Sequence, residues 1–284
     1  MFPTSSRWLT LLLVLSLASS LVLTDRTRAM AGSRADGAPV VFVADDYVFT
    51  GPDRIPSGVT TMQIVNKGRD LHHIQVLQLL QGKTAADFRA ALKENPGRMP
   101  QWIKFVGGPN AVVPGSEALA TMTLTEGEYL LICLIPNKDG LPHMVLGMQK
   151  PLSVTRLKPT LVSEPKAGLT ITQADFQFAM SRTVTAGSHT IQVLNHGTQP
   201  HEVVLVRLAP GVTAQQFAAA AETGGSAPPP GVPIGGVVGL ETGAHGYFTA
   251  QFEPGHYGLV CFFPDPATGK PHFVQGMTTD FTVE

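Results

Sequence analysis

Side chains that bind metal ions occur in this sequence as two sets with the same order. In each set a histidine comes first, and a cysteine, a second histidine and a methionine follow later in the chain. The sets are His72, Cys133, His143 and Met148, and His201, Cys261, His272 and Met277. Two imidazoles, one thiolate and one thioether are the donors of a trigonal His₂Cys copper site with a weak axial methionine. The sequence therefore predicts up to two copper ions per chain.

Neighbouring side chains and other metals fit this pattern less well. His73 follows His72, but the equivalent position in the second set is Glu202, so His72 is the preferred ligand. Met148 is preferred over Met144 for the same reason, and the histidines that do not recur are taken as non-ligands: His189, His196, His245 and His256. Zinc is less suited because methionine is a poor zinc ligand. A disulfide between Cys133 and Cys261 remains an alternative, and it would require their Cα atoms to lie within about 7 Å.

Both sets belong to an internal repeat. Shifting the chain by 129 residues places Asp46 on Asp175 and Asn66-x-Gly68 on Asn195-x-Gly197. With a shift of 128, Gly107-Gly108 coincides with Gly235-Gly236. This long-range register predicts two homologous domains, 37–155 and 169–284, joined by a proline-containing linker at 156–168.

Each repeat must hold its donors with short strands. Runs rich in β-branched, aliphatic and aromatic residues, separated mostly by Gly, Pro, Asn and Asp, predict strands at 40–49, 60–65, 73–79, 118–124, 129–134 and 145–154. One helix per repeat is expected, at 85–94 after the capping Thr84 and at 214–222 after Thr213. We therefore expect an all-β protein with one short helical insertion in each of two small sandwiches or barrels.

The segments that carry the donors resemble the cupredoxins, the type 1 blue copper proteins. Residues 127–133 and 255–261 look like the strand that leads into the ligand cysteine, and the His-x4-Met spacing of the last two donors is that of plastocyanin. The resemblance covers essentially the whole chain after its first segment, twice. It implies two tandem Greek-key β-sandwiches like plastocyanin or azurin, each with a type 1 copper site whose second histidine has its ring edge near solvent. The nine and ten residues between cysteine and histidine exceed the usual number, as in copper nitrite reductase.

Two cupredoxin domains in one chain also describe copper nitrite reductases and two-domain laccases. Those enzymes add a catalytic copper, and a histidine beside the ligand cysteine connects the two centres. Here the neighbours of Cys133 are Ile132 and Leu134, those of Cys261 are Val260 and Phe262, and no His-x-His pair occurs. We therefore expect an electron carrier and not an enzyme.

Composition and the first residues bear on location and partners. The chain has 284 residues, 14% charged residues and a formal net charge of −1, so its charge does not favour nucleic acid as a partner. Arg7, an apolar run and Ala29-Met30-Ala31 are typical of a cleaved secretory signal at 1–31. The expected product is a periplasmic or secreted protein without a membrane span, which exchanges electrons with redox partner proteins. A copper carrier or buffer with the same ligands, and a metal-free partner-binding sandwich, remain alternatives, and the oligomeric state is open.

Overall fold

The computed structural model describes residues 37–156, 162–223 and 230–284. The predicted signal segment 1–31 and part of the predicted linker lie outside these residues. Across the described ranges, none of the helices reaches the length and hydrophobicity that a membrane-spanning helix needs.

The first repeat is a sandwich of two sheets. Its strands are β1 Val40–Asp45, β2 Val48–Thr50, β3 Arg54–Pro56, β4 Gly58–Asn66, β5 Gln75–Leu79, β6 Ile103–Phe105, β7 Glu117–Leu124, β8 Gly127–Ile132 and β9 Gln149–Thr155. One layer has the order β2-β1-β4-β7 and the other the order β3-β9-β8-β5-β6. Helix α1, Ala85–Glu94, lies between β5 and β6 in the chain.

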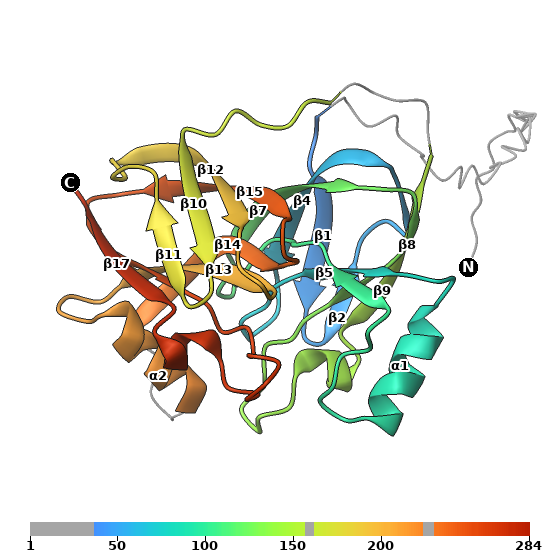
Figure 1. Cartoon of the computed structure of the whole chain (residues 1–284). Helices are drawn as coiled ribbons and strands as arrows, with labels where there is room; N and C mark the ends of the chain where they lie inside the picture. The colour runs from blue at the N-terminus through green and yellow to red at the C-terminus, as the bar shows by residue number, and fades with distance from the viewer. Residues whose placement is uncertain (1–36, 157–161, 224–229) are drawn as a thin grey trace, which may run out of the picture. The chain divides into compact units, whose positions relative to one another are not determined.

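The second repeat follows the same plan. Its strands are β10 Leu169–Ala174, β11 Gln177–Met180, β12 Gly187–Asn195, β13 His201–Leu208, β14 Gly231–Leu240, β15 His245–Phe252, β16 Gly255–Val260 and β17 Thr278–Val283, with helix α2 at Ala214–Thr223. The orders β11-β10-β12-β15 and β14-β13-β16-β17 match those of the first repeat, except that the edge strand β3 has no counterpart. The predicted fold, all-β with two tandem cupredoxin-like Greek-key sandwiches and one short helix in each, is confirmed (Figure 1).

Alternating side chains explain why these runs form half-buried strands. In β4 every second residue is buried from Thr60 to Asn66, and β1 alternates in the same way. The helices begin where the sequence predicts: the Thr84 hydroxyl accepts from the Asp87 N–H, and the Thr213 hydroxyl accepts from the Gln216 N–H. These bonds satisfy backbone donors that a helix leaves unpaired in its first turn.

Two predicted strands have other bounds in the structure. The run at 40–49 turns at Asp46 and Tyr47, so β1 and β2 form a hairpin instead of one strand. The run at 145–154 begins inside a 3₁₀ helix, η1 His143–Leu146, and Gly147 with φ of 111° ends that helix before β9. Its counterpart η2 is His272–Gln275. Periodicity alone did not distinguish one short helical turn from extended chain in an apolar run.

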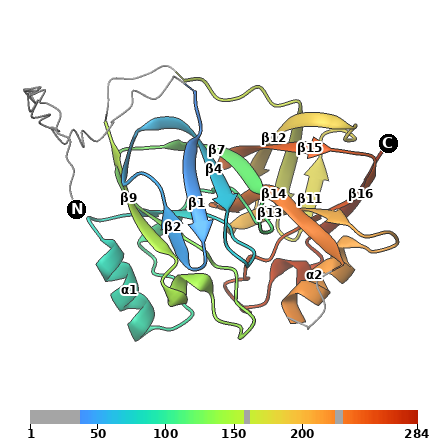
Figure 2. The ribbon, with the colours of Figure 1, turned by 180° about the vertical axis from the view of Figure 1, so that it is seen from behind.

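The repeats meet through an internal two-fold relation. Strands β7 and β15, which are equivalent, pair antiparallel with Ala120 opposite Phe248, and they lie side by side in both views (Figures 1 and 2). The segment after β6 crosses β14 in the same manner, with Pro109 opposite Val237. One apolar cluster contains residues of both repeats, among them Phe42 and Ile171. The interface is therefore built from equivalent segments that face each other.

The paired glycines of the repeat lie at this interface. Gly108 has φ of 130°, and a Cβ there would overlap the Ile74 carbonyl oxygen. Gly236 has φ of 118°, and a Cβ there would overlap the Val203 carbonyl oxygen. The close backbone approach explains why glycine occupies both positions.

Replacing Gly108 with alanine should therefore destabilise the protein strongly. Gly82 is the matched control, because its φ of 70° is also positive but a Cβ there meets nothing within 4 Å. We expect Gly108→Ala to lower the free energy of unfolding by about 3 kcal/mol and Gly82→Ala by about 1 kcal/mol. Denaturant unfolding checks this, and equal losses would contradict it.

Candidate metal centre

The first histidine of each set is delivered by a loop that the Asn-x-Gly motif shapes. The Asn66 side chain donates to the carbonyl oxygens of Asp70 and Val112, 2.8 and 2.9 Å away, and its Oδ1 accepts from the Gly68 N–H. A Cβ at Gly68 would come within 2.7 Å of His72 Nε2, so only glycine lets the loop pass. Asn195 makes the equivalent three bonds in the second repeat.

The other three donors come from the chain between the last two strands of each repeat. Backbone bonds tie them together: Met148 N–H donates to His143 O at 3.0 Å, and Cys133 N–H donates to Met148 O at 3.3 Å. The same bonds join Met277 to His272 and Cys261 to Met277, at 3.1 and 3.2 Å. The loops are thus held in the same form in both repeats.

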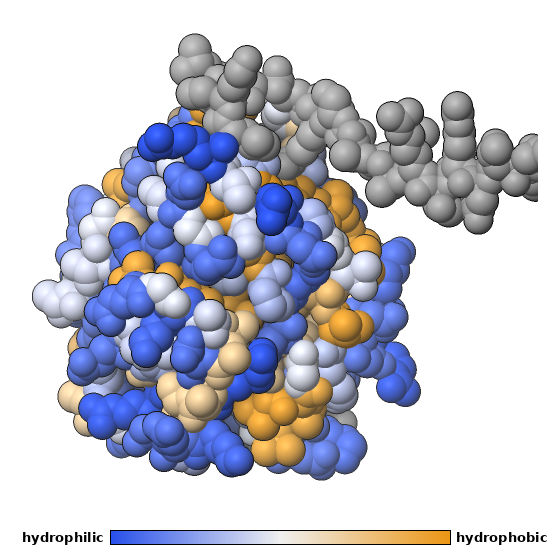
Figure 3. All heavy atoms as spheres, turned by 90° about the vertical axis from the view of Figure 1, so that its right-hand side faces the viewer, coloured by the Kyte–Doolittle hydropathy of each residue, from blue (hydrophilic) through white to orange (hydrophobic). Residues whose placement is uncertain are grey.

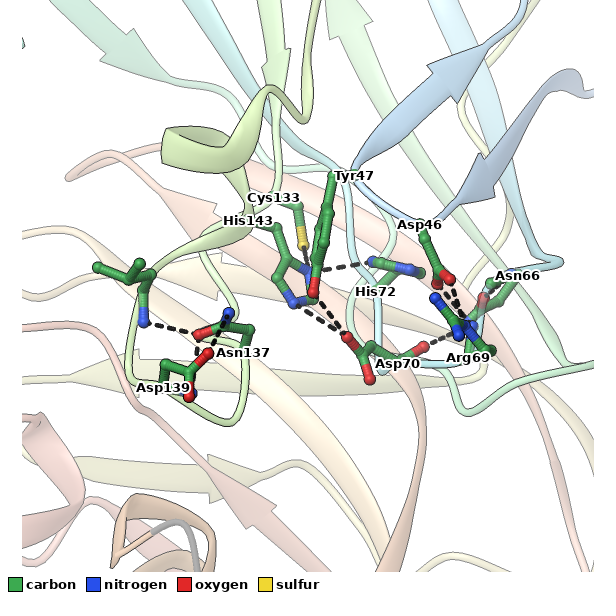
Figure 4. Close-up of polar contacts among 12 residues, drawn as sticks. Asp46, Tyr47, Asn66, Arg69, Asp70, His72, Cys133, Asn137, Asp139 and His143 are labelled. Carbon is green, nitrogen blue, oxygen red and sulfur yellow. Dashed lines mark hydrogen bonds and ion pairs between the residues drawn. The ribbon is translucent and has the colours of Figure 1, made fainter.

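In the first repeat these elements bring His72, Cys133 and His143 together (Figure 4). His72 Nδ1 lies 3.1 Å from His143 Nδ1, and Cys133 Sγ lies 3.5 Å from the same nitrogen. All three side chains are buried, and Met148 is packed in the same apolar cluster as Cys133. The three donors therefore lie inside the sandwich, out of contact with solvent.

In the second repeat His201, Cys261 and His272 form the same arrangement. The two Nδ1 atoms are 2.9 Å apart, and Cys261 Sγ lies 3.4 Å from His272 Nδ1. Met277 is fully buried in the same apolar cluster as Cys261. Within the described ranges, these two clusters are the groups of three or more His, Cys, Asp or Glu side chains that lie close enough to share a metal ion. The sequence predicted the histidines and the cysteine of each cluster.

The outer ring nitrogens show what the second cluster requires. His201 Nε2 lies 2.9 Å from a carboxylate oxygen of Asp175, and His272 Nε2 lies 3.0 Å from Gln199 Oε1. Both Nε2 atoms face oxygen acceptors, which favours the neutral tautomer with the ring proton on Nε2. Both Nδ1 atoms then direct lone pairs at each other. Such lone pairs repel at this distance unless a cation lies between them.

The donor set decides which cation fits. A metal-binding histidine commonly donates its second N–H to a carboxylate or an amide or carbonyl oxygen, as His201 and His272 do. Thiolate and thioether donors suit copper, and imidazoles suit it as well, whereas methionine is a poor ligand for zinc. The residues present therefore fit a copper ion in each cluster.

Burial controls the protonation of the donors. It lowers the pKa of His72 and of His272 to about 4, with a further decrease from the neighbouring imidazole, and it lowers the pKa of His143 and His201. Burial raises the pKa of the Cys133 thiol to about 12, and burial likewise holds the pKa of the Cys261 thiol well above its usual range. At neutral pH the imidazoles are thus ready to bind a metal, and the metal must displace the thiol proton.

An aromatic ring covers the second histidine of each set, which corrects one expectation. His143 and His272 are both 0% exposed, whereas the family resemblance implied a ring edge near solvent. Tyr47 packs on His143 with ring centroids 4.9 Å apart, and its equivalent Phe176 packs on His272 at 5.3 Å. Figure 4 shows Tyr47 beside His143. Both covering residues have φ near 65°, a strained conformation for a non-glycine residue, which is typical of functional positions.

Sequence reasoning passed over a second pair of residues near the clusters. His73 and Glu202 follow the first histidines, and both accept the backbone N–H of the residue after the cysteine. Leu134 N–H donates to His73 Nε2 at 2.8 Å, and Phe262 N–H donates to Glu202 Oε1 at 3.1 Å. Residue identity between the repeats does not reveal this equivalence, because imidazole and carboxylate differ in type although both accept a hydrogen bond.

The structure decides between the remaining sequence alternatives. Cys133 and Cys261 are free thiols, so the disulfide alternative is wrong. His73 points to the backbone beside the first cluster rather than joining its three donors. His245 contacts Glu164 of the connecting segment at 2.8 Å, away from both clusters. The preference for recurring positions therefore selected the histidines and cysteines that converge.

The metal-free protein should lose stability as the pH falls from about 6.5 to about 4. The unfolded chain takes up protons on its histidines near pH 6.5, whereas burial keeps His72 and His272 neutral to about pH 4. The stabilising effect is thus complete above pH 6.5 and is lost towards pH 4. Denaturant unfolding at several pH values measures it. A His72→Gln, His272→Gln variant should show a shallower decrease, and an unchanged slope would contradict the assignment.

Comparison with known proteins gives structural similarity without sequence matches. No family model matches the chain, and no curated protein matches it. Auracyanin A, a "blue" copper protein from Chloroflexus aurantiacus, is 19% identical with a TM-score of 0.29, over 42% of this chain and 98% of that chain. The Cu-containing nitrite reductase of Thermus scotoductus is 12% identical with a TM-score of 0.24, over 87% of this chain and 61% of that chain. The blue copper oxidase of Nitrosomonas europaea is 13% identical with a TM-score of 0.25, over 86% and 85%.

Proposed function

We propose that this protein binds one copper ion in each repeat, through two histidines, a cysteine and an axial methionine, and carries electrons. The observation that carries the proposal is the convergence of two imidazole Nδ1 atoms, 2.9 Å apart in the second repeat, with a thiol sulfur beside them. Both outer nitrogens of that repeat face acceptors, which leaves the inner lone pairs for a metal.

Electron transfer is favoured over other uses of copper by the rigidity of the surroundings. The ligand loop is closed by backbone bonds from Met148 to His143 and from Cys133 to Met148, and the pocket is buried. Buried donors that backbone hydrogen bonds hold in place move little when the metal changes its charge. The reorganisation energy of electron transfer is then small. The same donors accept both oxidation states of copper.

Redox partner proteins would contact the surface next to the first cluster. Leu141, Val145 and Leu146 are exposed around η1, which carries His143. The equivalent surface of the second repeat exposes Val274 but has Lys270 and Gln275 at the other two positions. On the face seen in Figure 3, apolar patches lie among hydrophilic side chains. Small apolar surfaces of this kind suit brief encounters between proteins. The predicted signal at 1–31 would place these encounters outside the cytoplasm.

Copper binding is tested by the visible absorption spectrum after addition of Cu(II) to the chain without residues 1–31. Charge transfer from thiolate to copper should give an intense band at about 600 nm. Cys133→Ser and Cys261→Ser should each remove about half of it, because each variant loses one thiolate. Loss in only one variant would restrict copper to one repeat. A colourless protein whose thiols stay free and react the same with and without copper would overturn the proposal in favour of a metal-free partner-binding sandwich.

Electron transfer and copper carriage are separated by redox cycling of the copper-loaded protein. An electron carrier should lose its band when ascorbate reduces it and regain all of it when ferricyanide oxidises it, with the copper retained on gel filtration. The buried ligands and the aromatic covers predict this retention. Rapid release of Cu(I) to a chromogenic chelator, with no return of the band, would support a carrier or buffer instead.

A further inference from the structure

One side chain of the first repeat reaches into the surroundings of the second cluster. Asn110 lies in the segment after β6 that crosses β14, and it is 1% exposed. Its Nδ2 donates to Glu202 Oε2 at 3.1 Å, and it also contacts the carbonyl oxygens of Val203 and Val237, at 3.0 and 3.3 Å. Its Oδ1 accepts from the Ala111 N–H at 2.7 Å. The amide is therefore fixed in orientation, with its donor group towards the second repeat.

Glu202 also hydrogen-bonds with the chain at the cysteine of the second cluster. Its second carboxylate oxygen, Oε1, accepts from the Phe262 N–H at 3.1 Å, and Phe262 directly follows Cys261. The backbone N–H of Glu202 lies 3.4 Å from Cys261 Sγ and donates to it. Both carboxylate oxygens thus accept from N–H groups, one from each repeat. The buried Glu202 side chain therefore connects Asn110 to the backbone N–H of the residue after Cys261.

The first repeat receives no amide from the second repeat. The position related to Asn110 by the internal two-fold is Val238, which is 1% exposed and has no donor. In the first repeat His73 takes the place of Glu202 and accepts the Leu134 N–H with its own ring nitrogen. Asn110 hydrogen-bonds with the His73 side chain too, so both partners of His73, Asn110 and Leu134, belong to the first repeat. The support across the interface therefore runs mainly from the first repeat to the second.

We propose that Asn110 of the first repeat is a positioning residue for the metal site of the second repeat, acting through Glu202 on the backbone beside Cys261. The proposal rests on the copper sites of the proposed function. It implies that the site of the second repeat is incomplete without the first repeat, whereas the site of the first repeat is self-contained. Residues that orient metal ligands typically change metal affinity by about 10- to 100-fold when they are replaced.

Two single-site proteins separate the effects on each cluster. Cys133→Ser leaves the site of the second repeat, and Cys261→Ser leaves that of the first. In the Cys133→Ser protein, Asn110→Leu should weaken Cu(I) binding about 10-fold or more, measured by competition with a chromogenic chelator. In the Cys261→Ser protein, Glu202→Gln should change the affinity by less than about threefold, because the site of the first repeat does not use this carboxylate. Asn110→Leu is not the control there, since it also removes the bond to His73. Val238→Ala is the matched control on the two-fold-related side, and it should leave both affinities nearly unchanged.

Glu202→Gln distinguishes positioning from a general effect on the interface. If Asn110 acts through the carboxylate, Asn110→Leu should have little further effect on Cu(I) affinity in a Cys133→Ser, Glu202→Gln protein. An undiminished effect there would overturn the proposal, because Asn110 would then act only through the packing of the interface. Equal weakening of both single-site proteins by Glu202→Gln would overturn it as well. Circular dichroism and thermal unfolding verify folding, and Asn110→Ser replaces Asn110→Leu if the leucine variant does not fold.

The thiols of the metal-free protein give a readout that does not depend on copper. A disulfide reagent such as dithiobis(nitrobenzoic acid) should react faster with Cys261 in the Asn110→Leu and Glu202→Gln variants than in the parent. Glu202→Gln should leave the rate at Cys133 unchanged. Faster reaction of both thiols in the Glu202→Gln variant, or of neither thiol in the Asn110→Leu variant, would contradict the proposal. If copper fails to bind either parent site, the proposed function fails, and the thiol rates still decide whether Asn110 orders the chain beside Cys261.

Discussion

Two imidazole nitrogens and one sulfur must face one another inside each sandwich, and the surrounding structure meets this requirement in several ways. In the second repeat the two Nδ1 atoms are 2.9 Å apart, and the Nε2 atoms of the same rings already contact Asp175 and Gln199. Side chains would not hold this arrangement in water, where each lone pair would find its own partner. Burial removes that option, and the backbone bonds of the cysteine, histidine and methionine loop keep the donors in place.

Duplication gave the chain two such sites and one interface made of equivalent segments. Because the segments containing Gly108 and Gly236 cross close to the backbone of the other elements, neither position tolerates a side chain. The side chains beside them are less constrained by the two-fold relation, and there the repeats differ. Asn110 faces Glu202 on one side, whereas Val238 occupies the related position on the other. The symmetry of the backbone thus coexists with unequal surroundings of the two clusters.

The position of the clusters relative to the surface bears on the proposed electron transfer. His143 and His272 are buried, and Tyr47 and Phe176 cover their rings from the β1–β2 and β10–β11 turns. An electron exchanged with a partner would therefore cross an aromatic ring or the η1 and η2 segments instead of entering at an open histidine edge. The strained backbone of both covering residues is maintained in both repeats, which indicates that the cover belongs to the site.

The sequence by itself determined the donors, the repeat, the helices with their threonine caps and the all-β class, since identity at a fixed spacing and local periodicity are properties of the chain alone. Only the tertiary structure decided that His143 and His272 are covered, that β7 joins β15, and that Asn110 reaches Glu202. The residues of the last two contacts are more than ninety positions apart. Such contacts depend on how two folded surfaces meet, and no spacing along the chain encodes which side chains then face each other.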